Sequence, residues 1–375
     1  MKVGVLTLRF HSNFGFIMQA YAMQYVIKQL GHEPYTYYTK VVEEKRINKA
    51  KQVIKNCLLK LIRKYNGPVI PHWPTNEDYE IIDTYTNQFV FDNIALTPYF
   101  SSIKELERYD HRCFEAFIVG SDQVWREEFS LNIPTYYFDF VKHPAKKISY
   151  AASFGVSKID YPKSLINKCK RLIRDFSFVS VREKEGVTIC RENFGVDAVQ
   201  VLDPTMLVDD KQYSSLADKS TKKYPDKYII TYILDETNKS TEFVAKLSKQ
   251  LDLPVVNILS YKKGKKVTPY PSIYDILKGF RDADFIVTDS FHASVFSILF
   301  NRQFCVLKNP YRGISRITTL LNTFCISDRI VDDTLPTNQI DFYNINKMLI
   351  GKRTDSLSLF NLSLIHISEP TRPEP

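Results

Sequence analysis

The chain has 375 residues, of which 44% are hydrophobic and 25% are charged, and its formal net charge is +9. This length exceeds the roughly 250–300 residues over which one hydrophobic core keeps growing, so two domains are expected, and the composition excludes large-scale disorder. The positive charge favours an anionic partner. No basic run interleaved with aromatic residues has the spacing of a nucleic-acid motif, so we expect a phosphorylated substrate or an anionic membrane surface and no nucleic acid.

The beginning of the chain, MKVGVLTLRF, reads as a β-strand and has neither the charged region nor the cleavage site of a secretory signal. We therefore expect a cytoplasmic protein. The longest apolar stretch, FHASVFSILF, is shorter than the about 20 residues that a membrane-spanning helix needs. The six cysteines are widely spaced, without a Cys-x-x-Cys pair, and predict buried free thiols and no metal site.

Short β-branched runs alternate with longer helical stretches along the first 205 residues. Strands are expected at KVGVLTL, EPYTYY, AFIVGSD, KKISYAA, FSFVSV and AVQVL, with helices such as IMQAYAMQYVIKQLG between several of them. This alternation is typical of parallel sheets covered by helices, so the fold class is α/β. We predict that residues 1–205 form one domain.

Residues 44–65, EKRINKAKQVIKNCLLKLIRKY, repeat apolar positions at helical spacing, with eight Lys or Arg on the remaining faces. Two interpretations stay open. We favour a solvated surface helix over a helix that docks on an anionic membrane surface. The second interpretation would give the protein a peripheral contact with the inner face of the plasma membrane.

Residues 206–225 are polar and charged, and the alternation restarts at YIITYIL and continues through PVVNIL, DFIVTD and FCVL. We predict a linker at 206–225 and a second α/β domain at 226–361. Two open α/β domains in tandem place a ligand cleft between them, at the carboxyl ends of the strands. Residues 362–375 break the periodicity and include three prolines, so we expect a non-native tail that contributes nothing to folding.

Three loops that follow predicted strands carry residues suited to binding or moving charge. In DFIVTDSFHASVFSILF, a helix begins near His292, and its first N–H groups suit a phosphate, although a polar cap without a ligand is equally consistent. In FSFVSVREKEGV, the planar guanidinium of Arg182 could pair with a phosphate or a carboxylate. A lone arginine more commonly forms a surface salt bridge. In FIVGSDQVW, Asp122 is either a turn-stabilising residue or an acid or base.

Taken together, these motifs resemble the polysaccharide pyruvyl transferase family. The matching stretches, in the family's order, are NFGFIMQAYAMQYVIKQLGH, FIVGSDQVW, ISYAASFG, FVSVREKEG, VLDPTML and TDSFHASVFSILF, within about residues 3–350. The resemblance implies two Rossmann-like domains in a GT-B-like arrangement, with phosphoenolpyruvate in the cleft between an acceptor-side first domain and a donor-side second domain.

The same resemblance implies an enzyme that places a pyruvate ketal on a sugar of a surface or extracellular polysaccharide, or of its lipid-linked precursor. Phosphoenolpyruvate would be the donor substrate, and no further cofactor is expected. Asp122, Arg182 and His292 fall where family members contact the donor. We expect catalytic roles for His292 and Asp122, with the assignment of acid and base left open, and substrate binding by Arg182.

The helix start departs from the family pattern. Some members have Arg-Leu-His where this chain reads Ser290-Phe291-His292, so the arginine that could pair with the donor carboxylate is absent. We still expect Ser290 and Phe291 to contact the substrate. Arg312, Arg316 and Lys308, in the following loops, are the residues that could replace the missing arginine.

Two other functions are consistent with such a fold. A glycosyltransferase that uses a nucleotide sugar would look the same, but the pair of glutamates eight residues apart that retaining members often carry in the second domain occurs here only at Glu107 and Glu115, in the first. A non-catalytic carbohydrate-binding protein would stack sugars on some of the 23 tyrosines and 25 phenylalanines. Most aromatic residues in such a chain belong to the core, which argues against this function.

Overall fold

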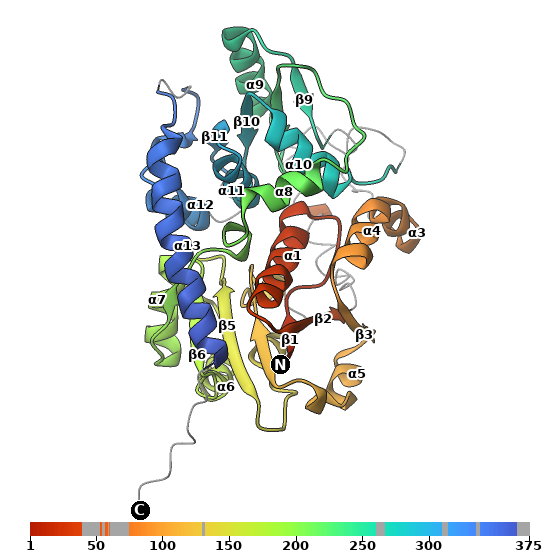
Figure 1. The fold of residues 1–375 in the computed structure, drawn as a ribbon, viewed down its shortest axis with the longest axis vertical. Helices are drawn as coiled ribbons and strands as arrows, with labels where there is room; N and C mark the ends of the chain where they lie inside the picture. Colours follow the sequence, from red (N-terminus) through yellow and green to blue (C-terminus); the bar gives the residue numbers. More distant parts are fainter. Residues whose placement is uncertain are drawn as a thin grey trace, which may run out of the picture.

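The structure is a computed structural model, and it describes residues 1–39, 53–54, 57–58, 60, 75–129, 132–259, 267–309, 314–334 and 338–365. Two parallel sheets organise these residues, one in each half of the chain (Figure 1). The expected α/β class with two Rossmann-like sheets is therefore confirmed. Most of the predicted helix at 44–65 lies outside the described residues, and so does Arg312.

The first sheet contains seven strands, and the printed pairings between them are all parallel. In sheet order they are β3 (Leu96–Phe100), β2 (Glu33–Thr39), β1 (Lys2–Leu6), β4 (Ala116–Val119), β5 (Lys146–Ala152), β6 (Phe178–Val181) and β7 (Val199–Gln200). Its helices are α1 (Phe14–Gln29), α3 (Asn76–Ile82), α4 (Thr84–Asn93), α5 (Ile103–Arg108), α6 (Lys163–Ile173) and α7 (Lys184–Ile189). Central strands such as β4 are buried at every position, which explains their continuous apolar sequence.

The second sheet has five parallel strands, in the order β12 (Ile330–Val331), β11 (Gln303–Leu307), β10 (Phe285–Thr288), β8 (Ile229–Tyr232) and β9 (Val255–Asn257). Its helices are α9 (Asn238–Leu251), α10 (Ile273–Asp282), α11 (Phe291–Leu299) and α12 (Ile314–Thr323). The chain passes from β8 to β9 on one side of β8, and then from β9 to β10 on the other side. Open sheets of this kind bind ligands at the carboxyl ends of the strands beside such a reversal.

The segment 206–225, predicted as a linker, contains the helix α8 (Asp210–Ala217). Tyr213 of this helix is fully buried, and its ring lies 4.8 Å from that of Phe296 in α11. Arg281 of α10 donates to the carbonyl of Ser214 at 3.1 Å. The polar sequence therefore belongs to a helix that is packed on one side, rather than to a free connector.

The last helix, α13 (Phe342–Ile365), follows the second sheet in sequence but runs alongside the first (Figure 1). The ring of Phe360 stacks on that of Tyr150 in β5, with 4.2 Å between the centroids. Leu202 donates its N–H to Ser356 Oγ at 3.1 Å, and Lys146 Nζ donates to the Leu364 carbonyl at 2.5 Å. The helix therefore joins the end of the chain to the first sheet.

For residues 362–365, this helix corrects the expectation of a tail that contributes nothing to folding. Residues 362–365 form its last turn, in which the side chains of Ser363 and Leu364 are buried. The composition of the segment suggested a break in structure, but the prolines come only after this turn. Residues 366–375 lie outside the described residues.

We predict that Leu364→Ala lowers the stability of the chain. The side chain is fully buried, so its truncation removes apolar contact and leaves a cavity, which commonly costs about 2–5 kcal/mol of unfolding free energy. Leu362→Ala is the matched control, since Leu362 is 49% exposed in the same turn and should change stability by less than about 0.5 kcal/mol. Urea unfolding of the two variants measures the difference. Equal urea midpoints for the two variants would mean that burial of Leu364 in the last turn of α13 does not stabilise the fold.

A shared hydrophobic core connects the two sheets. Phe14, at the start of α1, places its ring 5.0 Å from that of Phe296 and 5.5 Å from that of Phe280, both in the second half of the chain. One continuous cluster of buried residues includes strands of both sheets. Among the described residues, no helix combines the length and apolar character needed to cross a membrane.

Candidate active site

The loops that follow β4, β6, β7 and β10 bring four titratable side chains together at the carboxyl ends of the strands. Asp122 comes from the loop after β4, Arg182 directly follows β6, and Asp203 lies three residues after β7. His292 lies in the first turn of α11, after β10. The first three belong to the first sheet and His292 to the second, so the cluster joins the two halves of the chain.

Arg182 is the centre of this cluster. Its Nη2 donates to Asp122 Oδ1 at 2.9 Å and its Nη1 to Asp203 Oδ2 at 2.8 Å, while its side chain is only 3% exposed. The ring of Phe291 lies against the guanidinium, with 4.3 Å between Cζ and the ring centroid. This arginine is therefore a buried structural and electrostatic centre, unlike the surface salt bridge that is usual for a lone arginine.

Asp203 was not singled out from the sequence, although it lies in the stretch VLDPTML. Its Oδ1 accepts hydrogen bonds from the N–H and hydroxyl of Thr205, at 3.0 and 2.7 Å. Its Oδ2 accepts from Arg182 and also from Ser121 Oγ, the latter at 2.9 Å. The signal that could have identified it is an aspartate just beyond a strand, before the Pro-Thr start of a helical turn.

His292 lies on the other side of Asp203. The side chain is 7% exposed, and its Nε2 is 3.8 Å from Asp203 Oδ2, beyond ordinary hydrogen-bond distance. This nitrogen is buried and has no hydrogen-bond partner among the described residues. Ser290 caps the helix, since its Oγ accepts from Ala293 N at 3.5 Å. An uncommitted buried imidazole nitrogen is free to exchange a proton or bind a substrate group.

The backbone at Asp122 has an unusual conformation. Its φ is +65°, in the left-handed region that residues with a side chain rarely adopt. The Asp122 carbonyl accepts hydrogen bonds from Val124 N at 2.8 Å and Ser153 N at 2.9 Å, which hold the turn. Such conformations persist where the surroundings fix them and occur often at functional sites. Here the turn holds the carboxylate next to Arg182.

The charges in this cluster keep both aspartates ionised. Burial alone would raise the pKa of Asp122, but the neighbouring Arg182, with contributions from His292 and Arg316, outweighs it and lowers the pKa. The pKa of Asp203 is also lowered: burial is outweighed by the neighbouring side chains of His292 and Arg182. Burial opposes the charged form of Arg182 as well, yet Asp122 and Asp203 raise its pKa overall.

Arg316, one of the three residues expected to replace the missing arginine, lies beside this cluster. Its Nη1 is 3.6 Å from Asp122 Oδ1, and its side chain is 10% exposed. Burial and the neighbouring charge of Arg182 lower the pKa of Arg316 to about 10, so it remains protonated at neutral pH. The site therefore has two buried arginines side by side.

Arg182 and Arg316 both line a cavity of about 170 Å³, together with Asp203 and Phe291. Residues of α12 and α13, including Lys352, complete its walls. Asp122 and His292 do not line it: Asp122 contacts both arginines, and His292 lies behind Asp203. The arrangement can bind an anion between two arginines. The ionised carboxylate of Asp122 contacts both arginines, and the imidazole of His292 lies next to Asp203.

Comparison with known proteins decides the family. A model of the polysaccharide pyruvyl transferase family matches residues 13–311. The chain belongs to this family. The matched range contains Asp122, Arg182, Asp203 and His292, whereas Arg316 lies just beyond it. A search of curated proteins finds no match.

Solved structures of several other proteins resemble this pyruvyl transferase in fold. A UDP-GlcNAc 2-epimerase from Methanocaldococcus jannaschii, in complex with UDP-GlcNAc and UDP, is 11% identical and has a TM-score of 0.48, with 94% of this chain and 93% of that chain covered. MnaA from S. aureus, with UDP, is 15% identical at a TM-score of 0.45, covering 97% and 91%. MurG from Acinetobacter baumannii is 12% identical at a TM-score of 0.38, covering 97% and 95%.

Glu183 is a second residue of this pyruvyl transferase that the sequence did not reveal. It follows Arg182 and is fully buried, and its Oε1 accepts from Ser153 Oγ at 2.8 Å and Phe154 N at 3.0 Å. Its Oε2 is buried without a hydrogen-bond partner among the described residues. Burial raises the pKa of Glu183, against the opposing charge of Arg182. The glutamate anchors the loop at 153–155 to the end of β6.

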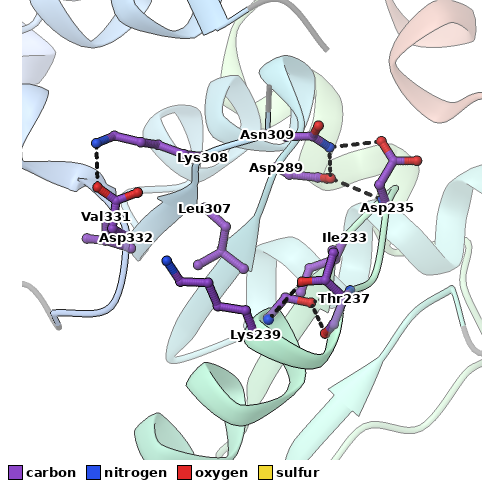
Figure 2. A pocket seen from close by; sticks show the side chains of 11 residues that line it. Ile233, Asp235, Thr237, Lys239, Asp289, Leu307, Lys308, Asn309, Val331 and Asp332 are labelled. Atoms are coloured by element: carbon purple, nitrogen blue, oxygen red, sulfur yellow. Dashed lines mark hydrogen bonds and ion pairs between the residues drawn. The ribbon is translucent and has the colours of Figure 1, made fainter. Parts of the chain in front are cut away.

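Lys308, another residue proposed from the sequence to replace the missing arginine, lies away from the arginine pair. It lines a second cavity, of about 120 Å³, and its Nζ is paired with Asp332 Oδ2 at 2.5 Å (Figure 2). In the same cavity, Asp289 Oδ1 accepts from Leu234 N at 2.7 Å, and Asn309 Nδ2 donates to Asp289 Oδ2 at 2.8 Å. Asp289 therefore ties the loops after β8 and β11 to the end of β10.

Within the described residues, no group of three or more His, Cys, Asp or Glu is arranged to hold a metal ion.

Proposed function

We propose that this pyruvyl transferase uses phosphoenolpyruvate as its donor and joins the pyruvyl group, as a ketal, to two hydroxyls of a glycan. The single observation that carries the donor assignment is the pair of buried arginines, Arg182 and Arg316, beside one cavity. Phosphoenolpyruvate has two anionic groups, a phosphate and a carboxylate, and arginine is the side chain best shaped to hold either one. The pair supports binding of both groups at once.

The reaction breaks four bonds, namely the C=C π bond, the bond from carbon to the phosphate oxygen and two hydroxyl O–H bonds, and it forms four in their place. A proton adds to the methylene carbon of phosphoenolpyruvate, and the oxygen of one sugar hydroxyl bonds to the carbon that carries the phosphate. That carbon then loses phosphate with its bridging oxygen, and the second hydroxyl takes its place. Two hydroxyl protons are released, which balance the proton added to carbon and the one taken up by phosphate. The protein must therefore supply an acid, a base and a stabiliser of the leaving phosphate.

We assign the proton donor to His292 and a base or electrostatic role to Asp122. The lowered pKa of Asp122 leaves its carboxylate ionised, so it is suited to accept a proton rather than to give one. Imidazole groups exchange protons near neutral pH. His292 lies behind Asp203, and catalytic contacts commonly tighten when substrates bind, which is compatible with its action on the donor.

Ser290 and Phe291 have supporting parts in this proposal. Phe291 stacks on the Arg182 guanidinium and lines the cavity, so it fixes the arginine at the donor. Ser290 caps α11 and accepts from Ala293 N, which orders the turn that carries His292. Arg312, outside the described residues, stays a prediction as a further ligand.

We predict that the chain consumes phosphoenolpyruvate and releases phosphate only when a suitable glycan is present. Glycans and lipid-linked oligosaccharides from the source cells serve as acceptors, and phosphate release is followed together with product mass. The expected product is heavier by one pyruvate ketal. The matched control replaces phosphoenolpyruvate with nucleotide sugars. A glycosyl-sized mass gain in that control, with phosphoenolpyruvate untouched, would instead identify the rival glycosyltransferase.

The chemical class of the acceptor is also a proposal. We propose a surface or extracellular polysaccharide, or its lipid-linked precursor, as the glycan. A cytoplasmic location at the inner face of the membrane, with contact through residues 44–65, would suit a lipid-linked acceptor, since eight basic residues in that segment attract acidic lipid. Comparing lipid-linked with free glycans in the same assay separates these two forms of acceptor.

A further inference from the structure

Gly15, in the first turn of α1, lies against the side chain of His292. A Cβ built on Gly15 would be 2.1 Å from His292 Nδ1 and 2.3 Å from its Cγ. Heavy atoms do not approach this closely without a bond, so any side chain at this position would displace the imidazole. The glycine leaves room for the ring to pack directly on the backbone of α1.

Backbone conformation does not explain this glycine. It is a helical residue outside the left-handed region, because the glycines with positive φ are Gly31, Gly120, Gly155 and Gly195 among the described residues. Within a helix, glycine costs about 1 kcal/mol relative to alanine. An alanine would therefore favour the helix, and what excludes it is the contact with His292.

The first turn of α1 is fixed in place on both sides of Gly15. Asn13 caps the helix, since its Oδ1 accepts from Phe16 N at 3.1 Å. Phe14 inserts its ring between Phe280 and Phe296, next to α11. The helix start therefore cannot easily withdraw from His292, and a group added at Gly15 would have to move the histidine instead.

The two edges of the imidazole thus meet different parts of the first half of the chain. The Nδ1 edge lies on Gly15, and Nε2 is directed to Asp203, at 3.8 Å from its Oδ2. We propose that Gly15 is a positioning residue, which holds the imidazole of His292 with Nε2 toward Asp203 and the arginine pair. This inference rests on the proposed function insofar as His292 acts on the donor.

The test combines activity with a stability cycle. Gly15→Ala should lower turnover by about 10²-fold, approaching the loss expected for a removed acid or base, while the Michaelis constant for phosphoenolpyruvate changes little because the arginines stay in place. Gly351→Ala is the matched control, since a Cβ on Gly351, also helical, would meet nothing within 4 Å. It should retain full activity and should not lower the melting temperature.

The stability cycle measures the contact without relying on activity. Gly15→Ala should lower the melting temperature when His292 is present. It should not lower it in a His292→Gly background, because a Cβ on Gly15 would also lie 2.6 Å from the Cβ of His292, and glycine removes the whole side chain and leaves only the helix preference. If Gly15→Ala alone fails to fold and the double variant folds, the contact is equally supported.

Two results would overturn the inference. One is full turnover in Gly15→Ala, and the other is the same fall in melting temperature with and without the His292 side chain. A failure of the proposed function looks different, since the unmodified chain would then transfer no pyruvyl group while the stability cycle still reports the contact between Gly15 and His292. The two failures are therefore distinguishable.

Discussion

Replacing His292 with alanine should reduce turnover by about 10²- to 10⁴-fold, the usual contribution of a group that moves a proton. The Michaelis constant for phosphoenolpyruvate should change much less, because Arg182 and Arg316 remain beside the cavity. Steady-state kinetics with saturating acceptor separate the two effects. The buried Nε2 of His292 makes no hydrogen bond among the described residues, so the substitution removes no hydrogen bond at this atom.

The matched control for damage to α11 is Ser297→Ala. Ser297 is buried on the same helix and donates only to the Ala293 carbonyl, at 2.8 Å, one turn within the helix itself. This variant should keep its turnover. Near-normal turnover in His292→Ala would remove the histidine from the catalytic residues, and an equal loss in both variants would assign the effect to the helix.

Replacing Arg182 with alanine should cost both activity and stability. From the sequence alone, we would expect such a variant to leave the fold intact. The structure changes this expectation, because Asp122 and Asp203 would lose the cation that both of them contact. Removing one partner of a buried ion pair commonly costs about 3–5 kcal/mol of unfolding free energy. The Michaelis constant for phosphoenolpyruvate should rise and turnover should fall, since the arginine would hold the donor in both the ground and transition states.

The loss of stability in Arg182→Ala should depend on pH in a defined direction. In the unmodified chain, the lowered pKa values of Asp122 and Asp203 stabilise the fold above about pH 4, the value of an unfolded aspartate, and this contribution is lost as pH falls. Without Arg182, burial is opposed less strongly and both pKa values rise. The difference in unfolding free energy between the two proteins should therefore be largest at neutral pH and should shrink as the pH falls below the raised aspartate pKa values of the variant.

Arg191→Ala is the control for loss of an arginine as such. Arg191 is 70% exposed on its side chain and is paired only loosely with Asp197, at 3.6 Å. Its replacement should leave both kinetics and stability nearly unchanged. An unchanged donor Michaelis constant in Arg182→Ala would contradict a role for this arginine in binding phosphoenolpyruvate, whatever the effect on stability.

The sequence predicted the strands well because most of them are buried on both faces. Runs such as AFIV at β4 and FIVT at β10 are continuous and apolar, and they occur where the structure has parallel strands. Asp122, Arg182 and His292 follow such strands. Parallel strands present their carboxyl ends at one edge of a sheet, which places Asp122 near Arg182 in the first sheet. The predicted cleft between two α/β domains places His292, which follows a strand of the second sheet, opposite them.

Pairwise contacts between distant segments could not be read from the sequence in the same way. Asp203 was not singled out from the sequence, and its contact with Arg182 depends on the neighbouring positions of β6 and β7. Arg316 and Lys308 were equivalent as basic residues in following loops, yet only Arg316 lies beside Asp122. Gly15 gave no signal, because its partner His292 is 277 positions away along the chain and in the other half of the fold.

The hydrophobic core shared by the two sheets determines how the molecule unfolds. Phe14 is shared between the two halves, and α13 fastens the end of the chain to β5, so neither half retains a complete interior alone. Such an arrangement favours cooperative melting in one calorimetric transition over the stepwise melting of loosely joined domains. Cutting the chain between the sheets would then yield fragments that expose apolar surface, and expression of either half as a separate polypeptide would be a route to aggregation.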